Sequence, residues 1–176
     1  MGEKIVTIFG TSRAKAGDST FALALETGRL LARAGFTIAN GGYGGTMLAA
    51  AKGAAEAGGK IIGVTCSVFK SSKANEYVTN EIVTDSLDNR LDTLIELGQA
   101  YIALPGGTGT LLELAKVWEL RNKGFLKPDK PIILTGEFWK PLVELLAADD
   151  PDSGRYVELA DNPERAVELI IEELRS

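Results

Sequence analysis

Near the middle of this 176-residue chain, a strand-like stretch leads through a glycine-rich turn directly into a helix-like stretch. The apolar run that ends at Leu104 predicts a buried strand, and the apolar spacing from Leu111 to Leu120 predicts a helix. Between them lie Gly106, Gly107, Thr108, Gly109 and Thr110. Glycine lets a backbone approach a ligand closely, and the unpaired N–H groups at a helix start attract phosphate. We therefore predict a phosphate-binding turn with Glu113 on the first helical turn beside it; the alternative is a tight turn that needs glycine only for its backbone.

Short apolar runs alternate with segments of helical spacing along the whole chain. The predicted strands cover residues 4–9, 36–39, 60–65, 81–84, 100–104, 131–135 and 156–159. The predicted helices cover residues 20–34, 47–57, 86–97, 110–122, 138–147 and 163–174. This alternation is typical of βαβ units, and continuous apolar strands are those of a parallel sheet with helices on both faces. The prediction is an α/β fold with a doubly wound parallel sheet, forming one domain over residues 1–176.

Two further turns are predicted to lie at the same edge of this sheet. Gly10, Thr11 and Ser12 follow the first predicted strand, and a glycine-rich run from Gly41 to Thr46 follows the second. Ligands of parallel sheets bind outside the carboxyl ends of the strands, where the strand order reverses. We therefore predict a nucleotide pocket, covered by a loop over residues 67–80, whose walls include Gly10, Thr11, Ser12, Gly42, Gly44 and Gly45. Taken alone, the second glycine-rich run is also compatible with a simple turn.

The helix predicted over residues 86–97 carries an arginine at the border of its apolar stripe. The predicted inward positions are Leu87, Leu91, Leu94 and Ile95. Arg90 lies beside this stripe, so it can reach the pocket as a partner of Glu113 or of the ligand. The alternative is a solvated arginine paired with an aspartate of its own helix, because charged side chains are mostly exposed.

Composition excludes several classes of function. The chain contains no histidine, which removes histidine-based acid–base catalysis, serine–histidine triads and histidine-ligated metals, and neither a metal nor a cofactor is predicted. A net charge of −5 without a basic stripe argues against nucleic acid as a partner. No apolar run approaches the ~20 residues needed to cross a membrane, and the first residues lack a signal-peptide pattern. Cys66 is the only cysteine, so no intramolecular disulfide can form and a cytoplasmic protein is expected.

With these residues in view, the chain resembles the Lonely Guy family, which contains cytokinin-activating phosphoribohydrolases and relatives once labelled possible lysine decarboxylases. The family signature P-G-G-x-G-T-x-x-E matches every fixed position from Pro105 to Glu113. The resemblance covers about residues 4–145, including the turns at 10–12 and 41–45. It implies a Rossmann-like fold and a homodimer. Surplus apolar residues on the helices predicted over 86–97 and 110–122 place that dimer contact there.

The resemblance also implies an activity, namely hydrolysis of the N-glycosidic bond of an AMP-like nucleoside 5′-monophosphate to free base and ribose 5-phosphate. Arg90 and Glu113 correspond to the family's catalytic pair. Family enzymes typically read M-H-E-R-K around the arginine, whereas residues 87–91 read L-D-N-R-L, which keeps the arginine but not its charged neighbours. This change favours an alternative, a non-catalytic carrier or sensor of a phosphorylated ligand such as a nucleotide or molybdenum cofactor, as in a related branch. A lysine decarboxylase is not predicted, because no lysine has an evident setting for a Schiff base with pyridoxal phosphate.

Overall fold

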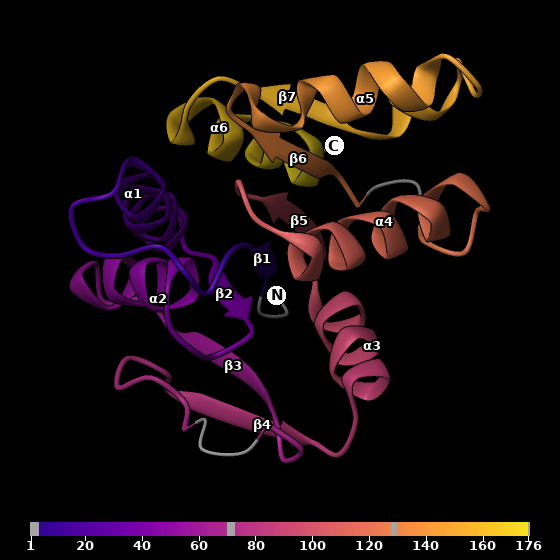
Figure 1. Cartoon of the computed structure of the whole chain (residues 1–176). Coiled ribbons are helices and arrows are strands. Elements are labelled where there is room, and N and C mark those ends of the chain that lie inside the picture. The colour runs from indigo at the N-terminus through magenta and orange to yellow at the C-terminus, as the bar shows by residue number, and fades with distance from the viewer. Residues whose placement is uncertain (1–3, 70–72, 128–129, 176) are drawn as a thin grey trace.

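In the computed structural model, which describes residues 4–69, 73–127 and 130–175, helices cover both faces of one parallel sheet (Figure 1). The strands are β1 (Ile5–Phe9), β2 (Thr37–Asn40), β3 (Ile61–Cys66), β4 (Asn80–Thr84), β5 (Ala100–Ala103), β6 (Ile132–Thr135) and β7 (Glu158–Ala160). The helices are α1 (Ser19–Arg33), α2 (Thr46–Glu56), α3 (Leu87–Leu97), α4 (Thr108–Asn122), α5 (Lys140–Ala147) and α6 (Pro163–Arg175). Short 3-10 helices, η1 and η2, cover Glu137–Trp139 and Ser153–Tyr156. The predicted doubly wound α/β fold is confirmed.

The order of the strands locates the point at which a ligand can enter the sheet. The order is β4-β3-β2-β1-β5-β6-β7, and each neighbouring pair is parallel. From β1 the chain moves outward to β4, returns through α3 to β5 on the other side of β1, and then moves outward to β7. The order therefore reverses between β1 and β5, where Phe9 pairs with Ala103. Ligands of such sheets bind just beyond these carboxyl ends.

The side chains of the central strands alternate between two apolar layers. On β1, Val6 and Ile8 pack in the layer that contains α1, α2 and α6. Phe9 points to the opposite layer, with α3 and α4, where its ring stacks on Tyr101 at a centroid distance of 6.1 Å. Because both faces of the sheet are covered by helices, successive residues of a central strand are buried on opposite sides. This explains the continuous apolar runs in the sequence.

Several predicted boundaries differ from the structure. The last strand was predicted at 156–159, but Tyr156 belongs to η2 and β7 covers 158–160. The helix predicted from residue 138 opens as η1, and α5 begins at Lys140. Of the loop predicted over 67–80, residues 70–72 lie outside the described residues and Asn80 already belongs to β4. None of the described helices is both long and apolar enough to cross a membrane.

Two further differences between prediction and structure affect the predicted site. Helix α4 begins at Thr108 rather than at residue 110, so Glu113 lies on its second turn and the prediction of the first turn is wrong. Leu87, predicted to face inward, is 46% exposed, whereas Arg90 is only 8% exposed. Leu87 is the first residue of α3, directly after the Ser86 cap and beyond the carboxyl edge of the sheet, where no strand covers it. The buried face of α3 therefore begins at Arg90.

Candidate functional site

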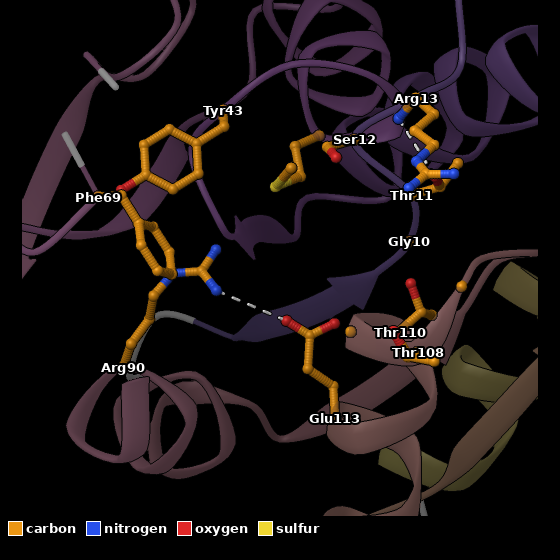
Figure 2. A pocket seen from close by; sticks show the side chains of 13 residues that line it. Gly10, Thr11, Ser12, Arg13, Tyr43, Phe69, Arg90, Thr108, Thr110 and Glu113 are labelled. Atoms are coloured by element: carbon orange, nitrogen blue, oxygen red, sulfur yellow. Dashed lines mark hydrogen bonds and ion pairs between the residues drawn. The ribbon is translucent and has the colours of Figure 1, made fainter. Parts of the chain in front are cut away.

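A pocket with a volume of about 690 Å³ opens at the carboxyl ends of β1 and β5 (Figure 2). It lies where the strand order reverses, and each of the predicted turns contributes to it. The residues that line it are Gly10, Thr11, Ser12, Arg13, Tyr43, Met47, Phe69, Arg90, Gly107, Thr108, Gly109, Thr110 and Glu113.

Most of the residues predicted from the sequence reach this wall, but four of the predicted glycines do not. The described lining lacks Gly42, Gly44, Gly45 and Gly106. A Cβ on Gly45, whose φ is +65°, would overlap the carbonyl oxygen of Thr11, and one on Gly106 would overlap the Thr110 side chain. Gly45 and Gly106 therefore allow the turns to approach their neighbours closely, and they shape the pocket from behind.

The turn after β1 is fixed to the start of α2. The carbonyl oxygen of Thr11 accepts hydrogen bonds from the Thr46 backbone N–H (2.8 Å) and from the Thr46 hydroxyl (3.0 Å). The hydroxyl oxygen of Thr11 accepts a hydrogen bond from the backbone N–H of Arg13 at 3.1 Å. These bonds hold the backbone of residues 11–13 in place at the pocket wall.

The first turn of α4 lines the pocket and leaves backbone N–H groups without a partner inside the helix. The helix is preceded by Gly107, which supplies no side-chain cap, and the N–H of Leu111 is the first to bond within the helix, to the carbonyl oxygen of Gly107 at 2.9 Å. The N–H groups of residues 108–110 precede that bond and have no partner inside the helix. A Cβ on Gly107 or Gly109 would meet no atom within 4 Å, so this end of the pocket is open. The dipole of α4 favours an anion at this end of the pocket.

Arg90 is buried, and its guanidinium is fixed from several sides. Nε donates to the carbonyl oxygen of Val64 (2.8 Å), and Nη2 donates to that of Gly41 (3.1 Å). The guanidinium carbon lies 5.4 Å from the centre of the Tyr43 ring and 5.8 Å from that of Phe69. A Cβ on Gly41 would overlap this guanidinium, so glycine is required there. The alternative of a solvated Arg90 paired on its own helix is wrong.

Glu113 projects from α4 toward Arg90, with 3.8 Å between Oε1 and Nη1 (Figure 2). Burial raises the pKa of the Glu113 carboxyl to about 7, and the positive charge of Arg90 opposes this rise. Both protonation states are therefore populated near neutral pH. A carboxylate in this state, held beside a fixed cation in a pocket that attracts anions, is suited to a reaction in which charge develops on the ligand.

Sequence reasoning missed four lining residues, namely Arg13, Tyr43, Met47 and Phe69. The hydroxyl of Tyr43 accepts from the backbone N–H of Cys66 (2.7 Å) and donates to the Cys66 carbonyl oxygen (3.3 Å), which anchors the ring. The Phe69 ring lies 5.9 Å from it at an angle of 55°. Arg13, Tyr43 and Phe69 each occur within a few residues of the carboxyl end of a strand, which is the signal that could have identified them.

Comparisons with known proteins agree with the signature at Pro105–Glu113. The family described as "possible lysine decarboxylase" matches residues 47–170. A cytokinin riboside 5′-monophosphate phosphoribohydrolase from Rhodococcoides fascians is 32% identical over 148 residues, which cover 81% of this chain and 74% of that protein.

Solved structures of molybdenum cofactor proteins share the whole fold. The molybdenum cofactor binding protein from Rippkaea orientalis superposes with a TM-score of 0.82 at 28% identity, covering 100% of this chain and 99% of that one. The molybdenum cofactor carrier protein from Chlamydomonas reinhardtii gives a TM-score of 0.80 at 25% identity, with 99% and 100% covered. The chain is thus similar in sequence to a phosphoribohydrolase and in structure to a molybdenum cofactor binding protein and a molybdenum cofactor carrier protein.

Proposed function

This chain belongs to the Lonely Guy family, also described as possible lysine decarboxylases, and from that premise we propose that it is a nucleoside 5′-monophosphate phosphoribohydrolase. The reaction adds water across the N-glycosidic bond and releases the free base and ribose 5-phosphate. The observation that carries the proposal is the ion pair between the buried Arg90 and the partly buried Glu113, which shares one pocket with the open N-terminus of α4. The similarity to a phosphoribohydrolase over 81% of the chain supports it.

The two ends of the pocket suit different parts of a nucleotide. Thr108 and Thr110 lie at one end, Tyr43 and Phe69 lie at the other, and Glu113 lies between them (Figure 2). The N-terminus of α4 suits the 5′-phosphate, and the aromatic rings suit the base, because every base has a face that stacks on an aromatic ring. In this orientation the ribose lies over Glu113.

Glu113 is the proposed catalytic carboxylate. Breaking the bond between base and ribose builds positive charge on the sugar, and an ionised carboxylate beneath the ring stabilises it. The same carboxylate can accept a hydrogen bond from a ribose hydroxyl or from the attacking water. Arg90 favours the ionised form of Glu113, since its charge opposes the effect of burial on the pKa of that carboxyl. Phosphate bound at α4 holds the sugar in position.

A second candidate is a non-catalytic carrier or sensor of a phosphorylated ligand. The altered neighbours of Arg90 favour it, because Leu91 packs in the apolar core and Asn89 donates to the Asp85 carboxylate at the surface. Neither supplies a charge to the pocket. The likeness to molybdenum cofactor proteins is compatible with this candidate, but shared fold alone does not favour it over the hydrolase. Decarboxylation through a Schiff base is less well supported, because no lysine occurs among the described residues that line the pocket.

The test is Glu113→Gln, assayed with a panel of nucleoside 5′-monophosphates by chromatography for free base. The amide keeps the shape of the side chain but removes the charge that stabilises the cationic transition state. We expect nucleotide binding to persist and turnover to fall about 100- to 1000-fold, or ~3–4 kcal/mol. Glu119→Gln, at an exposed position on the same helix, is the matched control and keeps its turnover.

The carrier predicts the opposite result in the same experiment. Wild-type protein would bind a nucleotide tightly and leave it intact for hours, and Glu113→Gln would change affinity only. That outcome would remove the hydrolase. Equal turnover by wild type and Glu113→Gln would keep the enzyme but reject Glu113 as its carboxylate.

We also propose that the protein is a homodimer in contact through α3 and α4. These helices lie side by side and are joined by an ion pair between Lys116 and Asp92 (Figure 1). Leu87 on α3 and Leu111 and Leu112 on α4 are 46%, 37% and 45% exposed, which suits burial by a second copy. Light scattering at micromolar concentration measures the assembly, and a monomer there would contradict the proposal.

A further inference from the structure

One charged side chain lies at the phosphate end of the pocket. The walls of this end come from the turn after β1 and from the start of α4, and Arg13 is the charged residue among the described residues that form them. Figure 2 shows Arg13 across Gly10 from Thr108 and Thr110, while Arg90 lies at the opposite end beside Tyr43. Arg90 is already bonded to backbone carbonyls and paired with a carboxylate, so it is not available to a distant phosphate.

The fold brings Arg13 and α4 together. Strands β1 and β5 are neighbours, Phe9 pairs with Ala103, and the N–H of Leu104 donates to the carbonyl oxygen of Phe9 at 2.9 Å. Paired strands lie about 4.8 Å apart, so the two turns that follow them leave the sheet side by side. A phosphate seated on the α4 N-terminus is therefore within the span of a long side chain from the neighbouring turn.

The backbone of Arg13 is fixed, but its guanidinium is not engaged. The backbone N–H donates to the Thr11 hydroxyl oxygen at 3.1 Å, and Thr11 in turn is bonded to Thr46. The Arg13 side chain is exposed, and among the described residues its guanidinium forms neither an ion pair nor a hydrogen bond. Its donors are thus free for a ligand.

We infer that Arg13 binds the terminal phosphate of the ligand and makes the pocket selective for phosphate monoesters. The inference rests on the proposed function, because it takes the ligand to be a nucleotide. A phosphate monoester carries a charge of about −1.5 to −2 at pH 7, whereas a helix N-terminus supplies the equivalent of roughly +0.5. The guanidinium supplies a full charge and can bind two phosphate oxygens at once. A phosphate diester has a single charge and gains less, and a nucleoside gains nothing.

The inference is tested by calorimetric binding to wild type, Arg13→Ala and Arg13→Lys. The probes are AMP and ribose 5-phosphate as monoesters, 3′,5′-cyclic AMP as the diester, and adenosine as the phosphate-free ligand. Arg13→Ala should lower the affinity for both monoesters about tenfold or more and lower the affinity for the diester less. The affinity for adenosine should stay within about twofold of the wild-type value. Arg13→Lys should fall between wild type and Arg13→Ala. Lys15→Ala removes a nearby exposed charge outside the pocket lining and should match wild type.

Turnover separates this inference from the proposed function. If the protein is a hydrolase, Arg13→Ala should raise KM for AMP about tenfold while kcat stays within about twofold, because the contact is made before and during the reaction. If wild type releases no base but Arg13→Ala still loses affinity for the monoesters selectively, the inference about Arg13 holds and the proposed hydrolase activity is rejected. Unchanged monoester affinity in Arg13→Ala, an equal loss for adenosine, or no binding of either monoester to wild type would overturn the inference.

Discussion

Each end of the pocket contains an arginine, and the two arginines differ in burial and in the partners of their guanidinium groups. Arg90 is buried, bonded to the carbonyl oxygens of Val64 and Gly41, and flanked by two aromatic rings. Arg13 is exposed, and among the described residues its guanidinium has no partner. A cation that is already fixed can favour the ionised form of Glu113 without reorganising during the reaction. A cation that is free loses side-chain entropy when it binds, but it can adapt to the position of a phosphate. The end of the pocket with Arg90 therefore suits the catalytic step, and the end with Arg13 suits binding of the phosphate.

The largest effect that tests this contrast is expected for Arg90→Lys. A lysine has one ammonium group and cannot bond to Val64 and Gly41 while facing Glu113, so buried carbonyl oxygens lose their donors. On the proposed function, turnover should fall about 100-fold or more. The free energy of unfolding should fall by about 3 kcal/mol in urea titrations. Arg33→Lys, at an exposed position near the end of α1, should change neither quantity. An Arg90→Lys variant with wild-type stability and turnover would show that the fixed geometry is unnecessary.

A somewhat smaller effect concerns the pH dependence of stability. The pKa of Glu113 rises from about 4.5, its ordinary value, to about 7 in the folded protein. The folded state therefore holds more protons than the unfolded state between these values, so this group lowers stability progressively as pH rises from about 4.5 to 7. Above pH 7 the loss is complete and amounts to about 3 kcal/mol.

Urea titrations of wild type and Glu113→Gln at pH 5 and pH 8 isolate this contribution. The difference in unfolding free energy between the two proteins should shift by about 2–3 kcal/mol in favour of the variant at the higher pH. Other titrating groups are common to both proteins and cancel. Parallel pH profiles would mean that the carboxyl of Glu113 is better solvated than its burial indicates.

The smallest effect is expected for Phe69→Leu. Leucine retains apolar bulk, but it removes the aromatic face that lies 5.8 Å from the Arg90 guanidinium. A contact of this kind contributes about 0.5–1 kcal/mol at a partly exposed site, so turnover should fall about two- to fivefold. Phe125→Leu, at a ring that is 77% exposed, provides the control in the same assay. A loss as large as that of Arg90→Lys would mean that Phe69 contacts the base directly.

Sequence patterns predicted the fold well because the elements are strongly periodic. Apolar runs and glycine-terminated helices located the strands and helices to within a few residues, and the alternation alone specified a parallel sheet. The error at Tyr156 has a local cause, since η2 and β7 follow each other within a few residues and no periodicity separates so short a strand from a turn.

The site was less accessible to sequence reasoning because it depends on distances between elements. By its spacing Leu87 belongs to the apolar stripe and Arg90 only borders it, and the position of the sheet edge decides that Arg90 is the buried one. The carbonyl oxygens of Val64 and Gly41 carry no mark in the sequence that identifies them as acceptors for an arginine. Phe69 reads as a loop residue, and its place over Arg90 follows from the path of the chain after β3.

The reversal of strand order also has a mechanical side. The halves of the sheet on either side of the reversal meet along one seam, where β1 and β5 are joined by four residue pairs. The pocket lies at the carboxyl end of that seam, with Thr11 on the side of β1 and Thr108 on the side of β5. A ligand bound to residues on both sides links the two halves of the sheet. At 100 times its Kd, such a ligand raises the free energy of unfolding by about 2.7 kcal/mol. On the proposed function, occupancy of the pocket therefore adds to the stability of the folded sheet.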